Sequence, residues 1–175
     1  WLGFTNVGVA SSTVNTNVGA YPNSNLLYTF TPPVPCTTPS AQPTSLVVGA
    51  TSILHNSING NSFVASSPAA SKYLVLVSTI NTPPSAAIIT DRTYYAVGTS
   101  YSGYRVLNAS PLLTFTATSL LPNQTYYFWV IPYNDSCFGA PFYNLTTILT
   151  TSATTCSTPT VVSPLSSIGG NEFTA

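Results

Sequence analysis

In many short segments of this chain, apolar and polar residues alternate one by one, and this period of two is typical of β-strands. Fifteen Pro and ten Gly interrupt the pattern, and no segment keeps apolar residues at helical spacing. Many short strands separated by turn residues predict an all-β chain folded as an antiparallel β-sandwich. The predicted strands lie at residues 44–50, 61–66, 72–79, 93–101, 104–108, 112–120, 125–133 and 144–153.

The run TYYFWVIPY at residues 125–133 is apolar on both of its faces. One face, which we expect in the core of the sandwich, consists of Tyr126, Phe128 and Val130. The other face, an apolar stripe on the outer side of the strand, consists of Tyr127, Trp129 and Ile131. Three interpretations are open for this stripe: cover by long side chains of the same face, docking of a neighbouring domain or subunit, or a platform on which sugars stack.

Charged residues make up only 3% of the chain, against roughly 25% in ordinary soluble domains. The net charge is zero, so the chain lacks the basic footprint of a nucleic-acid-binding protein. Ser and Thr together number 50 and must supply the polar surface instead. Because near-zero net charge promotes association, the composition favours either self-association or a coat of covalently attached glycans. The many aromatic and β-branched residues favour a packed core over disorder.

No apolar run approaches the 18–20 residues that a membrane-spanning helix needs, so no membrane span is predicted. The first residues lack the pattern of a secretory signal, and there is no initiating Met. This is expected of a mature or excised chain.

Residues 120–132, LLPNQTYYFWVIP, carry a more specific pattern. Leu120, Pro122 and Tyr126 are spaced as in fibronectin type III domains, where they lead into the penultimate strand. The whole stretch 36–155 resembles the fibronectin type III-like modules of large secreted surface proteins of Bacteroidota. The resemblance implies a fibronectin III/immunoglobulin-like sandwich in which the Tyr126 hydroxyl bonds back to the preceding loop. It implies an extracellular, bacterial cell-surface location but no particular chemistry.

The same resemblance places two of the three cysteines together. Cys36 would precede the first strand, and Cys137 would lie in the loop between the last two strands, at the same end of the sandwich. A Cys36–Cys137 disulfide is therefore expected, and it indicates an oxidising environment. Cys156 occupies the position of Cys36 in a following module, so its thiol is either free or paired with a partner in another copy.

The two ends of the chain look like parts of a second domain. Residues 156–175 begin with CSTP, as residues 36–39 read CTTP, and they match the first strands of such a module. Residues 1–35 also contain three candidate strands. We therefore expect three units, 1–35, 36–155 and 156–175, in which the terminal segments complete a second small β domain with a neighbouring copy. The expected assembly residues are Trp1, Leu2, Phe4 and Phe173.

This head-to-tail arrangement has two forms, and both remain open. The chain is either one repeat of a longer polypeptide or a subunit that donates strands to its neighbour without a covalent link. The alternative to both forms is that the chain is a fragment of a longer protein and that residues 156–175 are a frayed tail.

The sequence offers little for catalysis. His55 is the only histidine, and the three acidic residues are scattered, so neither a catalytic triad nor a metal or cofactor site is predicted. Asp91 and Arg92 are expected to form a solvated loop pair. Four N-glycosylation sequons occur at about the frequency expected by chance, at Asn108, Asn123, Asn134 and Asn144.

Two functions follow from these observations, and neither is enzymatic. The first is a structural subunit or repeat of an extracellular bacterial filament or surface array, whose partner is another copy of itself. The second is a carbohydrate-binding or adhesive module of a larger secreted protein, with Tyr101, Tyr104, Tyr127 and Trp129 as stacking rings.

Overall fold

The computed structural model describes residues 32–159, and these residues form a β-sandwich without helices. One sheet joins β1 (Thr44–Val47), β2 (Ser52–Ile53), β3 (Ile58–Val64) and β7 (Thr114–Ala117) around the central β3. The other sheet has the order β10-β8-β4-β6-β5, with β9 also paired to β8. Its strands are β4 (Lys72–Ser78), β5 (Ser100–Tyr101), β6 (Tyr104–Ser110), β8 (Thr125–Asn134), β9 (Phe142–Tyr143) and β10 (Leu149–Thr154). All pairings within the two sheets are antiparallel, which confirms the predicted fold class.

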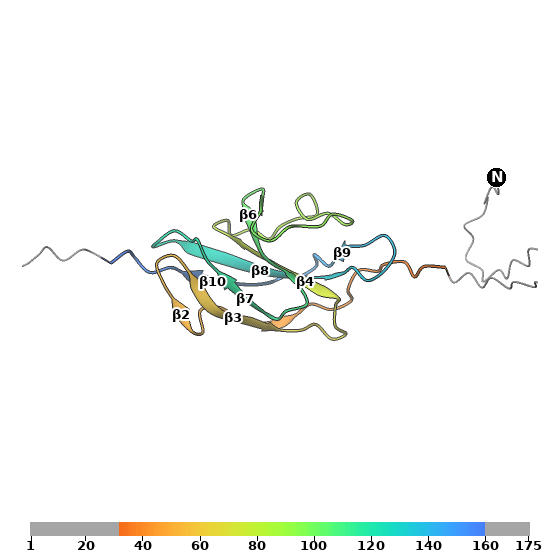
Figure 1. Cartoon of the computed structure of the whole chain (residues 1–175), viewed down its shortest axis with the longest axis horizontal. Coiled ribbons are helices and arrows are strands. Elements are labelled where there is room, and N and C mark those ends of the chain that lie inside the picture. The colour runs from red at the N-terminus through yellow and green to blue at the C-terminus, as the bar shows by residue number, and fades with distance from the viewer. Residues whose placement is uncertain (1–31, 160–175) are drawn as a thin grey trace, which may run out of the picture.

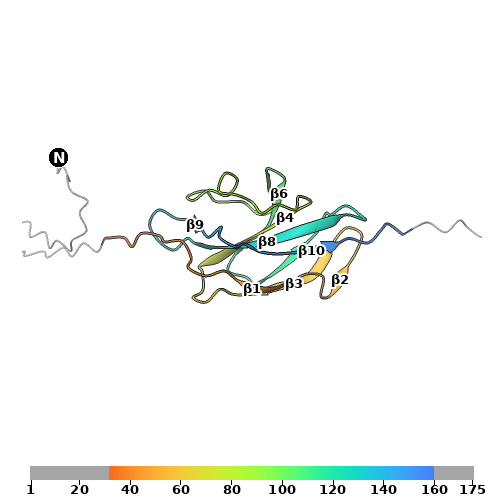
Figure 2. The same cartoon turned by 180° about the vertical axis from the view of Figure 1, so that it is seen from behind.

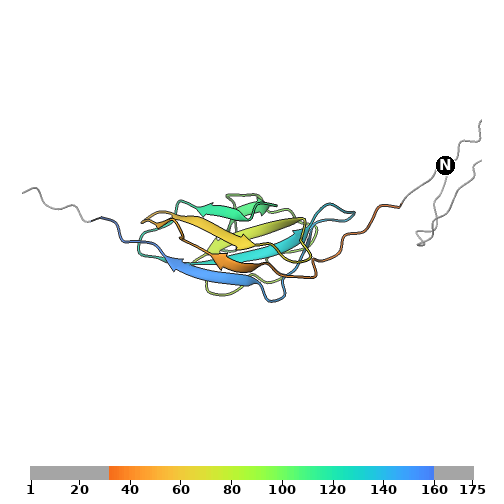
Figure 3. The same ribbon diagram turned by 90° about the horizontal axis from the view of Figure 1, so that it is seen from below.

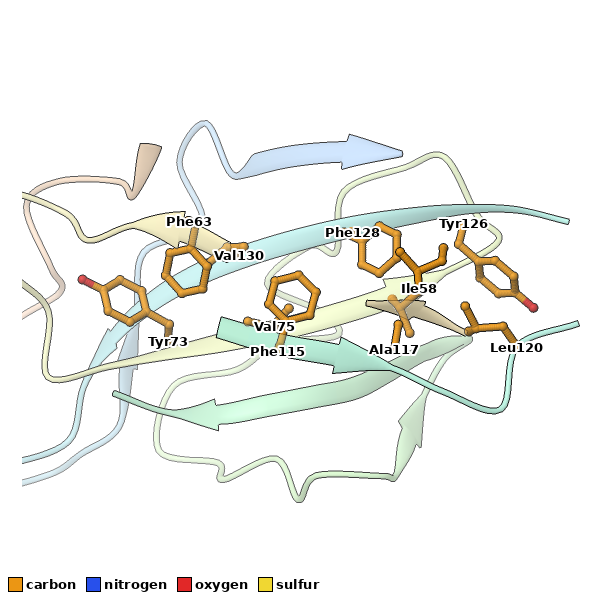
Figure 4. Close-up of a cluster of buried hydrophobic side chains, with 11 residues drawn as sticks. Ile58, Phe63, Tyr73, Val75, Phe115, Ala117, Leu120, Tyr126, Phe128 and Val130 are labelled. Atoms are coloured by element: carbon orange, nitrogen blue, oxygen red, sulfur yellow. The ribbon is translucent and has the colours of Figure 1, made fainter. Parts of the chain in front are cut away.

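The main core lies between the two sheets (Figure 4). Phe63 and Tyr73 pack edge to face at one end, and Leu120 and Tyr126 close the other end. Phe128 and Val130 of β8 are fully buried here, as the alternation along this strand predicts. The Tyr126 hydroxyl accepts a hydrogen bond of 2.8 Å from the backbone N–H of Leu121, so it ties the strand to the turn before it.

A bulge in β3 contains a buried asparagine. The side-chain amide of Asn61 donates to the carbonyls of Ile58 and Phe115 and accepts from the N–H of Gly49. Gly60 beside it has a φ of +72°, and a Cβ there would lie 2.1 Å from the Thr51 hydroxyl oxygen. Only glycine fits this conformation and this contact, so the Gly-Asn pair is a local requirement of the fold.

The outer side of β4 and β8 is covered by a second apolar cluster, and this corrects the expected outer stripe. Trp129 is 1% exposed and Ile131 is fully buried. They lie under the long connection between β4 and β5, whose Ile89 and Tyr95 are buried in the same cluster. Figures 1 and 2 show this connection on one side of β4 and β8 and the β3 sheet on the other. Only Tyr127 of the predicted stripe stays partly exposed.

Tyrosine hydroxyls fasten the connection to the sheet. Tyr104 donates to the carbonyl of Thr82 at 2.7 Å, and Tyr143 donates to the carbonyl of Thr93 at 2.8 Å. Within the connection itself, the Tyr95 hydroxyl donates to the carbonyl of Ile88 and accepts from the N–H of Thr90. Each ring thus buries an apolar body while its hydroxyl satisfies a loop backbone group.

The strand predicted at 93–101 is wrong over most of its length. Only Ser100–Tyr101 pairs, as β5, while residues 93–99 belong to the covering connection. Within residues 93–99 only Tyr95 is buried, and turns at Arg92 and Gly98, both at positive φ, prevent an extended strand. The short strands β2 and β9 were not predicted.

Substituting Ile89 with Ala tests the second apolar cluster. Ile89 is 1% exposed, so its truncation should lower the free energy of unfolding by about 2–5 kcal/mol. Val97, which lies on the same connection and is 61% exposed, is the matched control, and Val97→Ala should change it by less than about 0.5 kcal/mol. Urea unfolding measures both, and equal effects would contradict a buried role for the connection.

Candidate functional site

The two ends of the sandwich, here called its poles, are the places where the described chain arrives and leaves. The described chain enters at one end of the sandwich and leaves at the opposite end (Figures 1 and 3). The N-terminal pole consists of residues 34–36 and 137–138. The C-terminal pole consists of the turns 54–57 and 121–124 together with residues 155–156.

A disulfide between Cys36 and Cys137 holds the N-terminal pole together. Beside it, residue 35 and residue 138 form a parallel bridge: the N–H of Cys36 donates to the carbonyl of Phe138, and the N–H of Phe138 donates to the carbonyl of Val34, each at 2.9 Å. The incoming chain is therefore fixed to the loop between β8 and β9 before it reaches β1.

This pole carries two large exposed apolar side chains. Val34 is 73% exposed and Phe138 is 69% exposed, and their backbones are joined by the bridge just described. Phe142 follows Phe138 by four residues, and the centre of its ring lies 5.9 Å from the guanidinium of Arg92. The sequence carried no clear signal for this site, because a single apolar residue in a turn, such as Phe138 in CFGAP, is common on protein surfaces.

At the C-terminal pole the outgoing chain is hydrogen-bonded to two turns. The N–H of Cys156 donates to the carbonyl of Leu54 at 3.2 Å, and its carbonyl accepts from the N–H of Asn123 at 3.0 Å. The hydroxyl of Thr155 donates to the carbonyl of Leu121 at 2.7 Å. Two exposed side chains flank this exit: Leu54 is 47% exposed and Leu121 is 67% exposed.

Cys156 itself is a free, exposed thiol at this pole. Its Sγ lies 3.1 Å from the carbonyl oxygen of Ile53. The assembly residues Trp1, Leu2, Phe4 and Phe173 lie outside the described residues.

Three of the four sequon asparagines are built into the fold, which the sequence could not show. The side-chain N–H groups of these three donate to backbone carbonyls: Asn108 to Leu112, Asn134 to Thr37 and Asn144 to Pro39. Asn108 and Asn144 are also buried. Asn123, in contrast, is exposed in the turn before β8. An N-linked sugar therefore has room at Asn123 and would displace a structural bond at the other three.

The predicted pair Asp91–Arg92 does not act as a pair. Asp91 accepts a hydrogen bond of 2.8 Å from the N–H of Tyr143, and Arg92 points to the Phe142 ring. The one ion pair in residues 32–159 joins Lys72 and Asp135 at 2.6 Å. The hydrogen bond to Asp135 raises the pKa of Lys72, and this link between β4 and the end of β8 was missed because the two residues are far apart in sequence.

Buried tyrosines have raised pKa values. Burial raises the pKa of Tyr133 to about 12, with a smaller contribution from the negative charge of Asp135. Burial likewise raises the pKa of Tyr143 and of Tyr104. These phenols donate hydrogen bonds to backbone carbonyls, so their perturbation belongs to the fold and not to a catalytic centre.

Reactive groups are not gathered anywhere in residues 32–159. No three His, Cys, Asp or Glu side chains of this part of the chain lie close enough to hold a metal ion. His55 lies in the turn 54–57 at the C-terminal pole, half-buried. No helix among the described residues could cross a bilayer.

Comparisons with known proteins found structural likeness alone. No family model matches the chain, and no curated protein matches it. A β-sandwich protein from a computer-based redesign is 20% identical, with a TM-score of 0.45, over 66% of this chain and 95% of its own. The fibronectin type III domain of human fibronectin type III domain containing protein 3 is 19% identical, with a TM-score of 0.41, over 70% of this chain and 90% of its own. A fibronectin type III domain of human collagen XX is 20% identical, with a TM-score of 0.41, over 70% of this chain and 98% of its own.

Removing the disulfide should destabilise the sandwich strongly. The bond closes a loop with a sequence separation of 101, so the double variant Cys36→Ser, Cys137→Ser should lose about 2–5 kcal/mol of unfolding free energy. Cys156→Ser serves as the control, since that thiol is free, and should stay within about 0.5 kcal/mol of the native chain. A double variant as stable as the control would contradict a structural role for the bond.

Alkaline pH should destabilise the sandwich progressively as it rises from about 10 through 12. An unfolded tyrosine ionises near pH 10, whereas Tyr133 in the fold ionises at about 12. The stability that comes from keeping this phenol neutral is therefore complete below about pH 10 and is lost as the pH rises through 12. Tyrosinate absorbance should appear in two phases, the second together with loss of the β-sheet circular dichroism signal. Complete ionisation near pH 10 with the fold intact would overturn this expectation.

Proposed function

We propose that this chain is a structural subunit or repeat of an extracellular bacterial filament or surface array, assembled head to tail through its terminal β segments. In this proposal residues 156–175 of one copy and residues 1–35 of the next form one small β domain, which we call the junction domain. The disulfide supports an extracellular setting, because such bonds persist in oxidising compartments.

The observation that carries the proposal is a second copy, near the C-terminus, of residues with structural roles in the sandwich. Residues 57–65 read SINGNSFVA, and residues 167–175 read SIGGNEFTA. In the first copy Ile58 and Phe63 are core residues, Gly60 adopts positive φ, and Asn61 is the buried asparagine of the β3 bulge. The counterparts of these four are Ile168, Phe173, Gly170 and Asn171.

The matching cysteine motif supports the same alignment. Cys36 of CTTP lies at the start of the sandwich and is bonded to Cys137, while Cys156 of CSTP leaves from the opposite pole. If a second sandwich begins at the pole opposite the start of the first, successive sandwiches follow one another along a line, each contacting only its neighbours. The first two strands alone would be marginal in water, so they need further strands from elsewhere.

The adhesive alternative is weakened by the covered face. Two of the four rings considered for sugar stacking, Tyr104 and Trp129, are 3% and 1% exposed. Tyr101 and Tyr127 are only partly exposed and do not form a platform without them. Adhesion through other surfaces is compatible with a subunit of a surface array.

Light scattering and electron microscopy of the 175-residue chain test the non-covalent form. The expected result is a series of masses that are multiples of 18.4 kDa, ending in filaments. A variant that ends at Pro159 should remain a monomer because it lacks the second β3-like segment. A monodisperse monomer of the full chain with a protease-sensitive tail would end the strand-donation form.

A chain with two complete copies in tandem tests the covalent form. The junction of residues 156–175 and 1–35 should then resist proteases as well as the sandwiches do. Cleavage at this junction under native conditions would overturn the covalent form, and the failure of both experiments would overturn the proposal.

A further inference from the structure

We infer that the C-terminal pole is the docking surface for residues 160–175, so that the junction domain stacks end-on against the sandwich instead of hanging from a flexible linker. The inference rests on the proposed function and adds to it the surface that makes the joint. The surface is formed by Leu54 and Leu121, on either side of the outgoing chain.

The first argument is the shortness of the connection. Cys156 is still hydrogen-bonded to Leu54 and Asn123, so the chain is fixed to the pole at this residue. Three residues, Ser157–Pro159, separate it from the segment that follows, and they span about 10 Å even when fully extended. Thr158 precedes a proline and is restricted to extended conformations. The segment that begins at residue 160 must therefore start within about 10 Å of the anchored Cys156.

The second argument is the chemistry of the pole. Leu54 and Leu121 are exposed at two turns whose carbonyls both accept hydrogen bonds from the outgoing chain, at Cys156 and Thr155 respectively. The turns carry no Lys, Arg, Asp or Glu, so an apolar contact at the two leucines does not bury a carboxylate or a basic side chain of either turn. Residues 161, 162 and 165 of the outgoing segment are Val, Val and Leu, which are suitable partners for this surface.

The opposite pole repeats the arrangement. Val34 and Phe138 are exposed on either side of the bridge that fixes the incoming chain. The residues before the bridge, Pro32 and Pro33, limit bending because proline fixes φ. A junction domain held closely at both poles gives a stiff rod, in which each sandwich continues the axis of the one before.

The experiment compares three variants of the full chain. Leu54→Ser and Leu121→Ser alter the pole, and Val97→Ser, at a side chain 61% exposed on the flank, is the control. We expect each pole variant to raise the concentration at which the assembly dissociates by about tenfold, as expected when a buried leucine contact is lost. The control should dissociate at the native concentration. Thermal unfolding of the sandwich, which these exposed positions hardly affect, shows that all three variants are folded.

Each outcome decides between the inference and the proposed function. Weaker assembly of both pole variants, with straight rods for the native chain in electron microscopy, supports docking at the pole. Assembly of the pole variants at the native concentration, or a beaded and freely bending filament, overturns the inference and leaves head-to-tail assembly standing. Failure of the native chain to assemble overturns the inference together with the strand-donation form.

Discussion

The structure depends on one constraint: the two central strands of the larger sheet, β4 and β8, are apolar on both faces. Residues 73–78 and 128–133 are buried almost without interruption, whereas a strand on the surface of a two-layer sandwich would alternate. One face is covered by the opposing sheet. The other face needs a cover as well, and the chain supplies it from the connection that leaves β4.

This cover decides which surfaces remain for interaction. A face that would otherwise be available for a ligand or a neighbouring domain is filled with Ile89 and Tyr95 and closed by tyrosine hydroxyl bonds to the loop. Exposed apolar side chains are found at both poles, Val34 and Phe138 at one and Leu54 and Leu121 at the other, and also at single positions on the flanks such as Val97. The outer face of β4 and β8 is therefore closed to a partner, while the two poles, where the chain continues, keep exposed apolar side chains for a contact along the axis.

The scarcity of charge fits this picture. With three cationic and three anionic side chains in the chain, long-range electrostatics can neither guide nor prevent association. Polar groups serve inside the fold instead: Asn61 fills a bulge, and three sequon asparagines bond to loop carbonyls. The fold therefore accounts for those three asparagines, and Asn123 is the one sequon asparagine whose side chain is exposed.

Local pattern was enough for several features. The alternation along 125–133 separated the inner from the outer residues of β8 correctly. The resemblance of residues 120–126 to the fibronectin type III pattern located Tyr126, whose hydroxyl bonds to Leu121. The period of side chains along a strand depends on the backbone alone, so it is visible in sequence. Tertiary structure alone decided three other features: the cover over Trp129, the partner of Lys72, and the one sequon asparagine that is exposed. Each depends on segments far apart in the chain that meet in space, and no local pattern contains that distance.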